Sequence, residues 1–291
     1  MPILTGGCHC GLVQYQLDTQ LKHAAVCNCS ICLKKGVVNH RVKTDQFQLT
    51  QGEEHLTDYL FNTKLIRHRF CSVCGIHLYI LPVIDQGFVN VNLRTVSNPL
   101  PQWLPPVPPA GVSPQGVEWV LFDGAHWEEV AKAPAPLPAS QPNTPLRKYQ
   151  GGCHCGQVRF GLEARLDRAT LCNCSLCAKK AAVLHRVAPE AFHLLSGADR
   201  LTDYRFATKT ARHLFCSTCG IHAFNHPRIN PDHVVVNLRC LDNPDPAWLP
   251  PPPVHGARTP GDPPGPDWIV FDGARWDGPG HPAPTAAGAG K

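Results

Sequence analysis

The sequence contains one pattern twice, and this duplication restricts the possible fold more than any other feature. Each second occurrence lies 145 residues after the first. Roughly half of the aligned positions differ, yet every cysteine of the first copy has a counterpart in the second. A constant offset indicates a tandem duplication of a unit close to the size of one domain. The recurring cysteine motifs are GGCHCG (6–11 and 151–156), CNCSxC (27–32 and 172–177) and FCSxCGIH (70–77 and 215–222).

The repeat predicts two domains joined by a spacer. We assign the first domain to residues 1–130 and the second to residues 149–278. Residues 131–148 are rich in Pro and Ala, a composition typical of an extended, semi-rigid linker. Residues 279–291 are mostly Gly, Ala and Pro, and we expect a disordered tail there.

Proline content and periodicity favour strands over helices. The chain has 30 prolines in 291 residues, and each proline inside a helix removes a hydrogen bond and clashes with the preceding turn. Apolar and polar residues alternate near 13–17, 47–49, 88–93 and 119–122, which is the pattern of half-buried strands. The sequence therefore predicts a mainly β fold in which each domain is built from short antiparallel strands.

The charge distribution argues against a nucleic-acid partner. The net charge of +5 comes entirely from residues 146–291, because residues 1–145 carry equal numbers of basic and acidic side chains. No run of five like charges occurs in the sequence. The basic stripe expected of a protein that follows a phosphate backbone is therefore missing.

Cysteine usage and the absence of targeting signals indicate a reducing compartment. The N-terminus has no basic segment followed by an apolar run, and no stretch approaches the roughly 18 apolar residues of a membrane helix. We therefore expect a cytoplasmic protein that does not bind membranes. In such a compartment clustered cysteines usually bind metal or react, and seldom form disulfides.

Within each copy, the seven cysteines divide naturally into four and three. A C-x-x-C turn lets two thiolates face one ion at about 2.3 Å, and a second pair from a distant segment completes a tetrahedron. We expect the outer pairs to form a closed structural zinc site, whose binding energy is coupled to folding. The predicted ligands are Cys8, Cys10, Cys71 and Cys74 in the first copy, and Cys153, Cys155, Cys216 and Cys219 in the second.

The middle three cysteines of each copy leave a zinc ion with an open fourth position, which is the pattern of a reactive zinc site. Three thiolates give this centre a net negative charge, so it should activate water poorly. It is better suited to holding another soft ligand, such as a thiol, in the thiolate form. The pattern favours chemistry on a sulfur substrate and argues against a hydrolase. The predicted catalytic ligands are Cys27, Cys29 and Cys32, and Cys172, Cys174 and Cys177.

Other arrangements of the three cysteines remain open at this stage. A histidine ligand would close the triplet into a second structural zinc site, whereas a disulfide framework or a metal-free thiol relay would remove the metal. The fifteenth cysteine, Cys240, faces Thr95 in the other copy, and we expect it to be a small buried hydrophobic residue. The histidine candidates are His9, His40, His68 and His77.

Two lysines follow each triplet. They lie either on a solvated turn or near the metal, where they would bind the carboxylates of an acidic thiol. The second interpretation makes Lys34, Lys35, Lys179 and Lys180 substrate-binding residues.

A proline-rich stretch also occurs inside each copy, at 99–114 and 244–266. We interpret both stretches as long surface loops. The alternative is that they dock a proline-binding protein partner.

These motifs together resemble the glutathione-dependent formaldehyde-activating enzyme family, which also includes centromere protein V. The resemblance rests on G-x-C-x-C-G, C-N-C-S-x-C-x-K-K, F-C-S-x-C-G-I and the terminal F-D-G, and it covers residues 6–127 and 151–276. It implies a β-tent (Mss-four-like) zinc fold in both copies. The outer four cysteines would hold a structural zinc, and the middle three a catalytic zinc that glutathione can approach.

The resemblance leads to two functional hypotheses. The first is a zinc-dependent carbon–sulfur lyase-type enzyme, similar to S-(hydroxymethyl)glutathione synthase, with two zinc ions per domain and four per chain. It would act on the adduct of a small-molecule thiol, glutathione, with a small electrophile such as formaldehyde. The alternative is a non-catalytic, zinc-stabilised module that binds a protein partner through the proline-rich loops.

Overall fold

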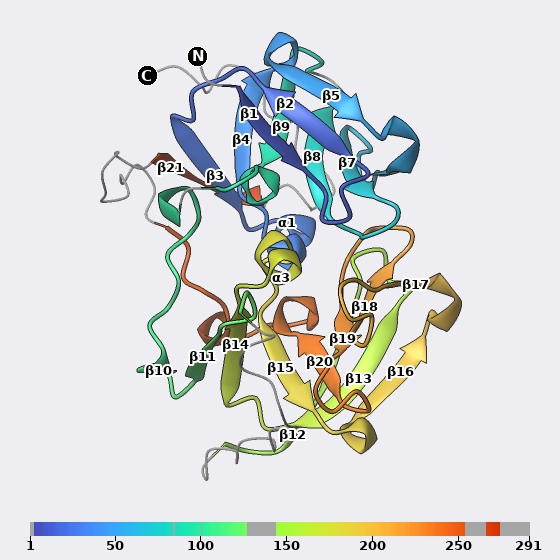
Figure 1. Cartoon of the computed structure of the whole chain (residues 1–291). Helices are drawn as coiled ribbons and strands as arrows, with labels where there is room; N and C mark the ends of the chain where they lie inside the picture. Colours follow the sequence, from blue (N-terminus) through green and yellow to red (C-terminus); the bar gives the residue numbers. More distant parts are fainter. Residues whose placement is uncertain (1–2, 84, 100, 127–143, 254–265, 274–291) are drawn as a thin grey trace.

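The computed structural model describes residues 3–83, 85–99, 101–126, 144–253 and 266–273. Each repeat forms most of one lobe, and two short helices lie between the lobes (Figure 1). The structure is mainly β, with short and largely antiparallel strands, which confirms the predicted fold class.

The first lobe contains a seven-stranded and a three-stranded sheet. The order in the larger sheet is β21-β3-β4-β9-β8-β7-β6, and the smaller sheet has the order β1-β2-β5. The strands of the larger sheet are β3 (His23–Cys27), β4 (Asn39–Lys43), β6 (Leu56–Tyr59), β7 (Ile66–Cys71), β8 (His77–Pro82), β9 (Phe88–Asn92) and β21 (Asp267–Phe271). The smaller sheet contains β1 (Leu4–Gly7), β2 (Gln14–Leu17) and β5 (Phe47–Gln51).

The second lobe repeats this architecture, with eight strands in the order β10-β11-β14-β15-β20-β19-β18-β17 and three in the order β12-β13-β16. The larger sheet contains β10 (Gly111–Val112), β11 (Glu118–Phe122), β14 (Arg168–Cys172), β15 (Leu184–Val187), β17 (Leu201–Tyr204), β18 (Arg212–Cys216), β19 (Phe224–His226) and β20 (Val234–Asn237). The smaller sheet contains β12 (Arg147–Gly152), β13 (Arg159–Ala164) and β16 (Phe192–Ser196).

Helices are short throughout the described residues, as the proline content predicts. The α-helices are α1 (Ser30–Lys35) and α3 (Ser175–Lys180). Single 3₁₀ turns are η1 (Thr44–Gln46), η2 (Glu53–His55), η3 (Leu93–Thr95), η4 (Pro101–Trp103), η5 (Pro189–Ala191), η6 (Ala198–Arg200), η7 (Leu238–Cys240) and η8 (Pro246–Trp248).

The strands near the end of each repeat are exchanged between the lobes. Strand β11 comes from the first repeat but pairs in parallel with β14 of the second, and β21 pairs in parallel with β3 of the first (Figure 1). Each exchanged strand buries a tryptophan, because Trp119 and Trp268 are only 5% and 3% exposed. Burying so large an apolar side chain stabilises the exchanged arrangement.

The predicted domain limits, 1–130 and 149–278, follow the repeat in the sequence but do not separate the two large sheets. Most of the predicted linker at 131–148 lies outside the described residues, although Arg147 and Lys148 at its end belong to β12. The predicted tail at 279–291 also lies outside the described residues.

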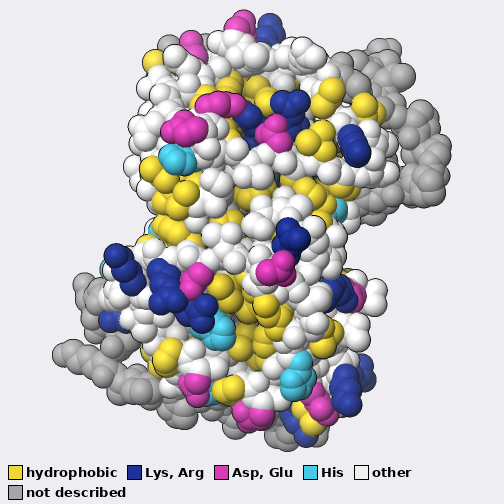
Figure 2. Space-filling model, turned by 90° about the vertical axis from the view of Figure 1, so that its right-hand side faces the viewer, with side chains coloured by type: hydrophobic (Ala, Val, Ile, Leu, Met, Phe, Trp, Pro, Cys, Tyr) yellow, Lys and Arg dark blue, Asp and Glu magenta, His cyan; other side chains and the backbone are white. Residues whose placement is uncertain are grey.

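The surface carries both signs of charge. In Figure 2, basic and acidic side chains are interspersed over the visible face of both lobes. No helix in the described part of the chain is long and apolar enough to cross a bilayer.

Candidate metal centres

Four sulfur atoms from two distant segments meet in each lobe, grouped as the sequence predicts. In the first lobe, Cys8 and Cys10 follow β1, while Cys71 ends β7 and Cys74 lies in the turn before β8. All four sulfurs lie within 4.8 Å of one another. The equivalent group in the second lobe is Cys153, Cys155, Cys216 and Cys219.

The sulfur spacing in these groups fits a tetrahedral metal ion. Ligands at about 2.3 Å from a zinc ion would lie about 3.8 Å apart. The distance is 3.4 Å between the sulfurs of Cys8 and Cys10, and 3.7 Å between those of Cys10 and Cys71. The corresponding distances in the second lobe are 3.4 and 3.6 Å. Both groups could therefore hold a metal ion with little rearrangement.

The chain also stabilises negative charge in these groups before any metal binds. The backbone N–H of Val13 donates to the sulfur of Cys8 over 3.3 Å, and Val158 does the same for Cys153. Hydrogen bonds from neighbouring thiols, that of Cys10 first, hold the pKa of Cys8 far below its usual value. Because a metal ligand must be a thiolate, this environment favours metal binding.

The middle three cysteines form a separate group in each lobe. Cys27 ends β3, Cys29 precedes α1, and Cys32 lies on the helix. Their three sulfurs lie within 4.8 Å of one another, as do those of Cys172, Cys174 and Cys177. In both groups the third cysteine is buried and the first two are half-buried. Solvent therefore reaches part of the first two residues of each group.

Neighbouring thiols lower the pKa of one cysteine in each triplet. Hydrogen bonds from the thiols of Cys29 and Cys32 lower the pKa of Cys27 to about 3. In the second lobe, hydrogen bonds from Cys172 and Cys177 lower the pKa of Cys174 to about 2. This environment favours the thiolate form, which is the form that binds a metal ion.

The four candidate histidines lie elsewhere. Nε2 of His9 is 2.9 Å from Oγ of Ser175 in the other lobe, and Nδ1 of His40 is 2.7 Å from the carbonyl oxygen of His23. His68 and His77 are buried with ring centroids 5.7 Å apart. Among the described residues, no histidine belongs to either group of three sulfurs.

Within the residues it describes, the structure does not contain the disulfide framework that the cysteine count left open. All 15 cysteines are free thiols in the structure. Cys240 is fully buried, as predicted, and its thiol faces the carbonyl oxygen of His222 at 3.7 Å.

Two of the candidate lysines bridge the repeats. Nζ of Lys34 donates to the carbonyl oxygens of Gly152 and Cys240 at 3.2 and 3.1 Å. Lys179 donates in the same way to Gly7 and Thr95. Contact of these lysines with substrate stays a prediction, and the observed bonds indicate a structural role between the repeats.

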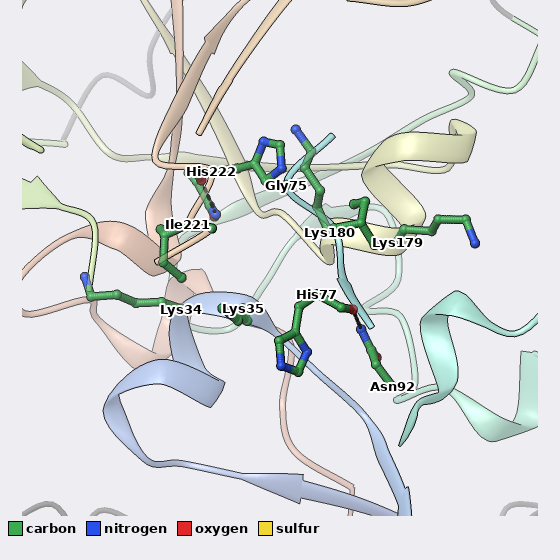
Figure 3. Close-up of a pocket in the computed structure, with 12 residues that line it drawn as sticks. Lys34, Lys35, Gly75, His77, Asn92, Lys179, Lys180, Ile221 and His222 are labelled. Atoms are coloured by element: carbon green, nitrogen blue, oxygen red, sulfur yellow. Dashed lines mark hydrogen bonds between the residues drawn. The ribbon is translucent and has the colours of Figure 1, made fainter. Parts of the chain in front are cut away.

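The other two lysines, Lys35 and Lys180, are not on a solvated turn, because they are only 8% and 7% exposed. All four lysines line a cavity between the two helices, together with His77 and His222 (Figure 3). The cavity has a volume of about 20 Å³, which holds about one water molecule. It is too small for a substrate such as a tripeptide.

Sequence reasoning missed the residues that surround the triplets. Asn28 and Asn173 stand between the first two cysteines of each triplet, and each bonds the aspartate of an FDG motif. Both motifs are identical in the two repeats, although about half of the aligned positions differ. Because these motifs are identical in both repeats, the sequence could have identified them as part of the site. It does not show that each asparagine bonds the aspartate of the opposite repeat.

A sequence model of the glutathione-dependent formaldehyde-activating enzymes matches residues 3–108 and again 148–254. The two matches cover most of the chain. The chain belongs to the glutathione-dependent formaldehyde-activating enzyme family. Membership agrees with two tandem copies, and with cysteine groups that could hold metal ions in each.

Both family matches end before the exchanged strands. The first stops at residue 108, short of β11, and the second at residue 254, short of β21. Among solved structures, a crystal structure of a Rhodobacter sphaeroides protein is 29% identical in sequence. That similarity covers 34% of this chain and 92% of the other, with a TM-score of 0.32.

Proposed function

We propose that this family member is a zinc-dependent carbon–sulfur lyase-type enzyme, similar to S-(hydroxymethyl)glutathione synthase. It joins a thiol, glutathione, to a small electrophile such as formaldehyde, or reverses that step. The observation that carries the proposal is the pair of three-sulfur groups, in each of which two cysteines are only half-buried. The four-sulfur groups would hold the structural zinc ions, which gives four zinc ions per chain.

The reaction needs no further co-reactant. The sulfur of the thiol forms a bond with the carbonyl carbon of formaldehyde, and the thiol proton ends on the carbonyl oxygen. When bound, zinc would supply a soft Lewis acid that keeps the substrate sulfur in its thiolate form.

The residues of the triplet suit this task. Cys27 and Cys29 are half-buried, while buried Cys32 anchors the group to α1. The backbone N–H of Cys29 donates to the sulfur of Cys27 over 3.4 Å, which fixes the direction of that ligand. The second repeat has the same bond between Cys174 and Cys172, at 3.5 Å.

Calorimetric titration of the zinc-loaded chain with glutathione tests the proposal. S-methylglutathione is the matched control, because it keeps both carboxylates and lacks the thiol. We expect glutathione to bind and S-methylglutathione to bind at least tenfold more weakly. A chain with Cys29→Ser and Cys174→Ser should lose the binding while it keeps its fold.

Two results would contradict an enzyme that captures a thiol. One is the absence of detectable glutathione binding, and the other is equal binding of both tripeptides. Either result would favour the alternative, a non-catalytic zinc-stabilised module that binds a protein partner through the proline-rich stretches at 99–114 and 244–266. The cytoplasm remains the expected location, because the proposed thiol chemistry needs reduced cysteines.

A further inference from the structure

The exchanged strands end beside the three-sulfur groups of the opposite repeat. In the β21–β3 pair, Phe271 stands opposite Cys27, the first cysteine of the triplet. In the β11–β14 pair, Phe122 stands opposite Cys172 in the same way. The residues after each phenylalanine therefore enter the neighbourhood of a metal centre that belongs, by sequence, to the other repeat.

A glycine follows two residues later and touches the sulfur. A Cβ atom on Gly273 would lie 2.3 Å from the sulfur of Cys27, and one on Gly124 would lie 2.5 Å from that of Cys172. Real side chains do not approach so closely, so each turn requires glycine here. The backbone of Gly273 also hydrogen-bonds the sulfur of Cys27.

An aspartate–asparagine pair holds each turn in place. Nδ2 of Asn28 donates to Oδ1 of Asp272 over 3.0 Å, and Nδ2 of Asn173 donates to Oδ1 of Asp123 over 2.9 Å. In the second pair, the asparagine Oδ1 also accepts from the backbone N–H of Ala125. Since each asparagine lies between two sulfur-bearing residues, the pair ties the exchanged turn directly to the triplet.

A histidine from the opposite repeat adds a second contact. Nε2 of His154 is 2.9 Å from Oγ of Ser30, the first residue of α1, and its Nδ1 is 2.8 Å from the hydroxyl of Tyr59. His9 makes the equivalent contacts with Ser175 and Tyr204. Each triplet is thus approached by two separate segments of the other repeat.

We propose that each three-cysteine centre is a composite site that needs both repeats. Asp272 and Gly273 of the second repeat complete the Cys27 site, and Asp123 and Gly124 of the first repeat complete the Cys172 site. These four are positioning residues, which fix the sulfurs for a metal ion. The inference rests on the proposed metal-dependent function and adds that neither half of the chain carries a complete site.

The test uses the full chain with a single triplet left intact. Replacing Cys172, Cys174 and Cys177 with Ser leaves the first site as the reporter, and replacing Cys27, Cys29 and Cys32 leaves the second. We measure the rate at which a colorimetric chelator removes zinc from the remaining triplet. Gly273→Ala should accelerate removal at least tenfold in the first reporter and leave the second unchanged, while Gly124→Ala should do the reverse.

Two milder substitutions keep the test valid if the glycine variants do not fold. Asp272→Ala and Asp123→Ala remove one side-chain bond each, and they should show the same crossed pattern with a smaller effect. The proposal is overturned if a change in Gly124 or Asp123 affects the Cys27 site of its own repeat. It is equally overturned if none of the four variants affects either site.

A second measurement separates this inference from the proposed function. In the chain with all its cysteines and with zinc in the four-sulfur groups only, the alkylation rates of Cys27 and Cys172 can be followed by mass spectrometry. Gly273→Ala should alter the rate at Cys27 alone, and Gly124→Ala the rate at Cys172 alone. If the reporter chains bind no zinc at the triplets, the proposed function fails, and the alkylation pattern still decides whether the sites are composite.

Discussion

Gly36 and Ala181 meet where the two short helices end, and only one of them has room for a methyl group. A Cβ on Gly36 would lie 2.6 Å from the Cβ of Ala181. The two residues are equivalent, 145 positions apart, and both have left-handed backbone angles, with φ of 57° and 49°. These two equivalent residues therefore meet, and their contact has room for only one methyl group.

Exchanging these two residues tests whether they are in contact. Gly36→Ala should lower the free energy of unfolding by about 1–3 kcal/mol, because the new methyl overlaps an existing one. Ala181→Gly removes a left-handed alanine and should raise it by up to about 1 kcal/mol. The double variant places the methyl on the other repeat, so chemical denaturation should give a stability near that of the parent chain. Additive effects of the two changes would show that the side chains do not meet.

Lys34 should contribute to stability through the contact between the repeats. Lys34→Met leaves the carbonyl oxygens of Gly152 and Cys240 without this donor, and we expect the free energy of unfolding to fall by about 1–3 kcal/mol. The matched control is Lys148→Met, a change in an exposed side chain on β12. Unchanged stability together with weaker glutathione binding would instead favour the predicted substrate contact.

The two kinds of cysteine group should respond differently to the loss of one ligand. Cys71→Ser and Cys29→Ser should each reduce the zinc content by one ion per chain. Cys71 is fully buried and joins β7 to the segment after β1, so its loss should lower the melting temperature strongly. Metal binding contributes about 10–16 kcal/mol in zinc-finger peptides, which sets the scale. Cys29 is half-buried, and we expect a much smaller shift. Equal shifts would argue against separate structural and reactive centres.

Buried His40 should make the fold sensitive to acid. Burial lowers the pKa of His40 from 6.5 to about 4, although a bond to the carbonyl oxygen of His23 opposes the shift. The unfolded chain therefore takes up a proton first, and stability present above pH 6.5 is lost as the pH falls toward 4. The loss amounts to at most about 3 kcal/mol.

Comparing the parent chain with His40→Gln at each pH isolates this contribution from acid release of metal. We expect the difference in the free energy of unfolding to shrink as the pH falls from 6.5 to 4. A difference that stays constant across this range would contradict the assignment.

Much of the fold could be predicted because its causes are local. The alternation of Tyr15 and Leu17 with polar residues predicts β2, and both side chains are buried there. The spacing of the cysteines predicts their grouping into four and three, because short turns bring neighbouring thiols to one side.

The exchange between the repeats could not be predicted in this way. Trp119 and Phe122 predict a strand, but nothing in their periodicity tells which lobe that strand joins. Both repeats offer an equivalent edge, and the choice depends on long-range packing. For the same reason, the sequence predicts a solvated or substrate-binding role for Lys34. In the fold, Lys34 lies between the repeats.

The most direct test of thiol capture is zinc K-edge X-ray absorption of the fully loaded chain before and after glutathione is added. The account predicts that the mean number of sulfur ligands per zinc rises on addition, because each triplet metal gains one. It predicts no rise in the chain with Cys29→Ser and Cys174→Ser, because that chain has lost the triplet zinc ions. An unchanged sulfur count in the parent chain at saturating glutathione would contradict the central claim.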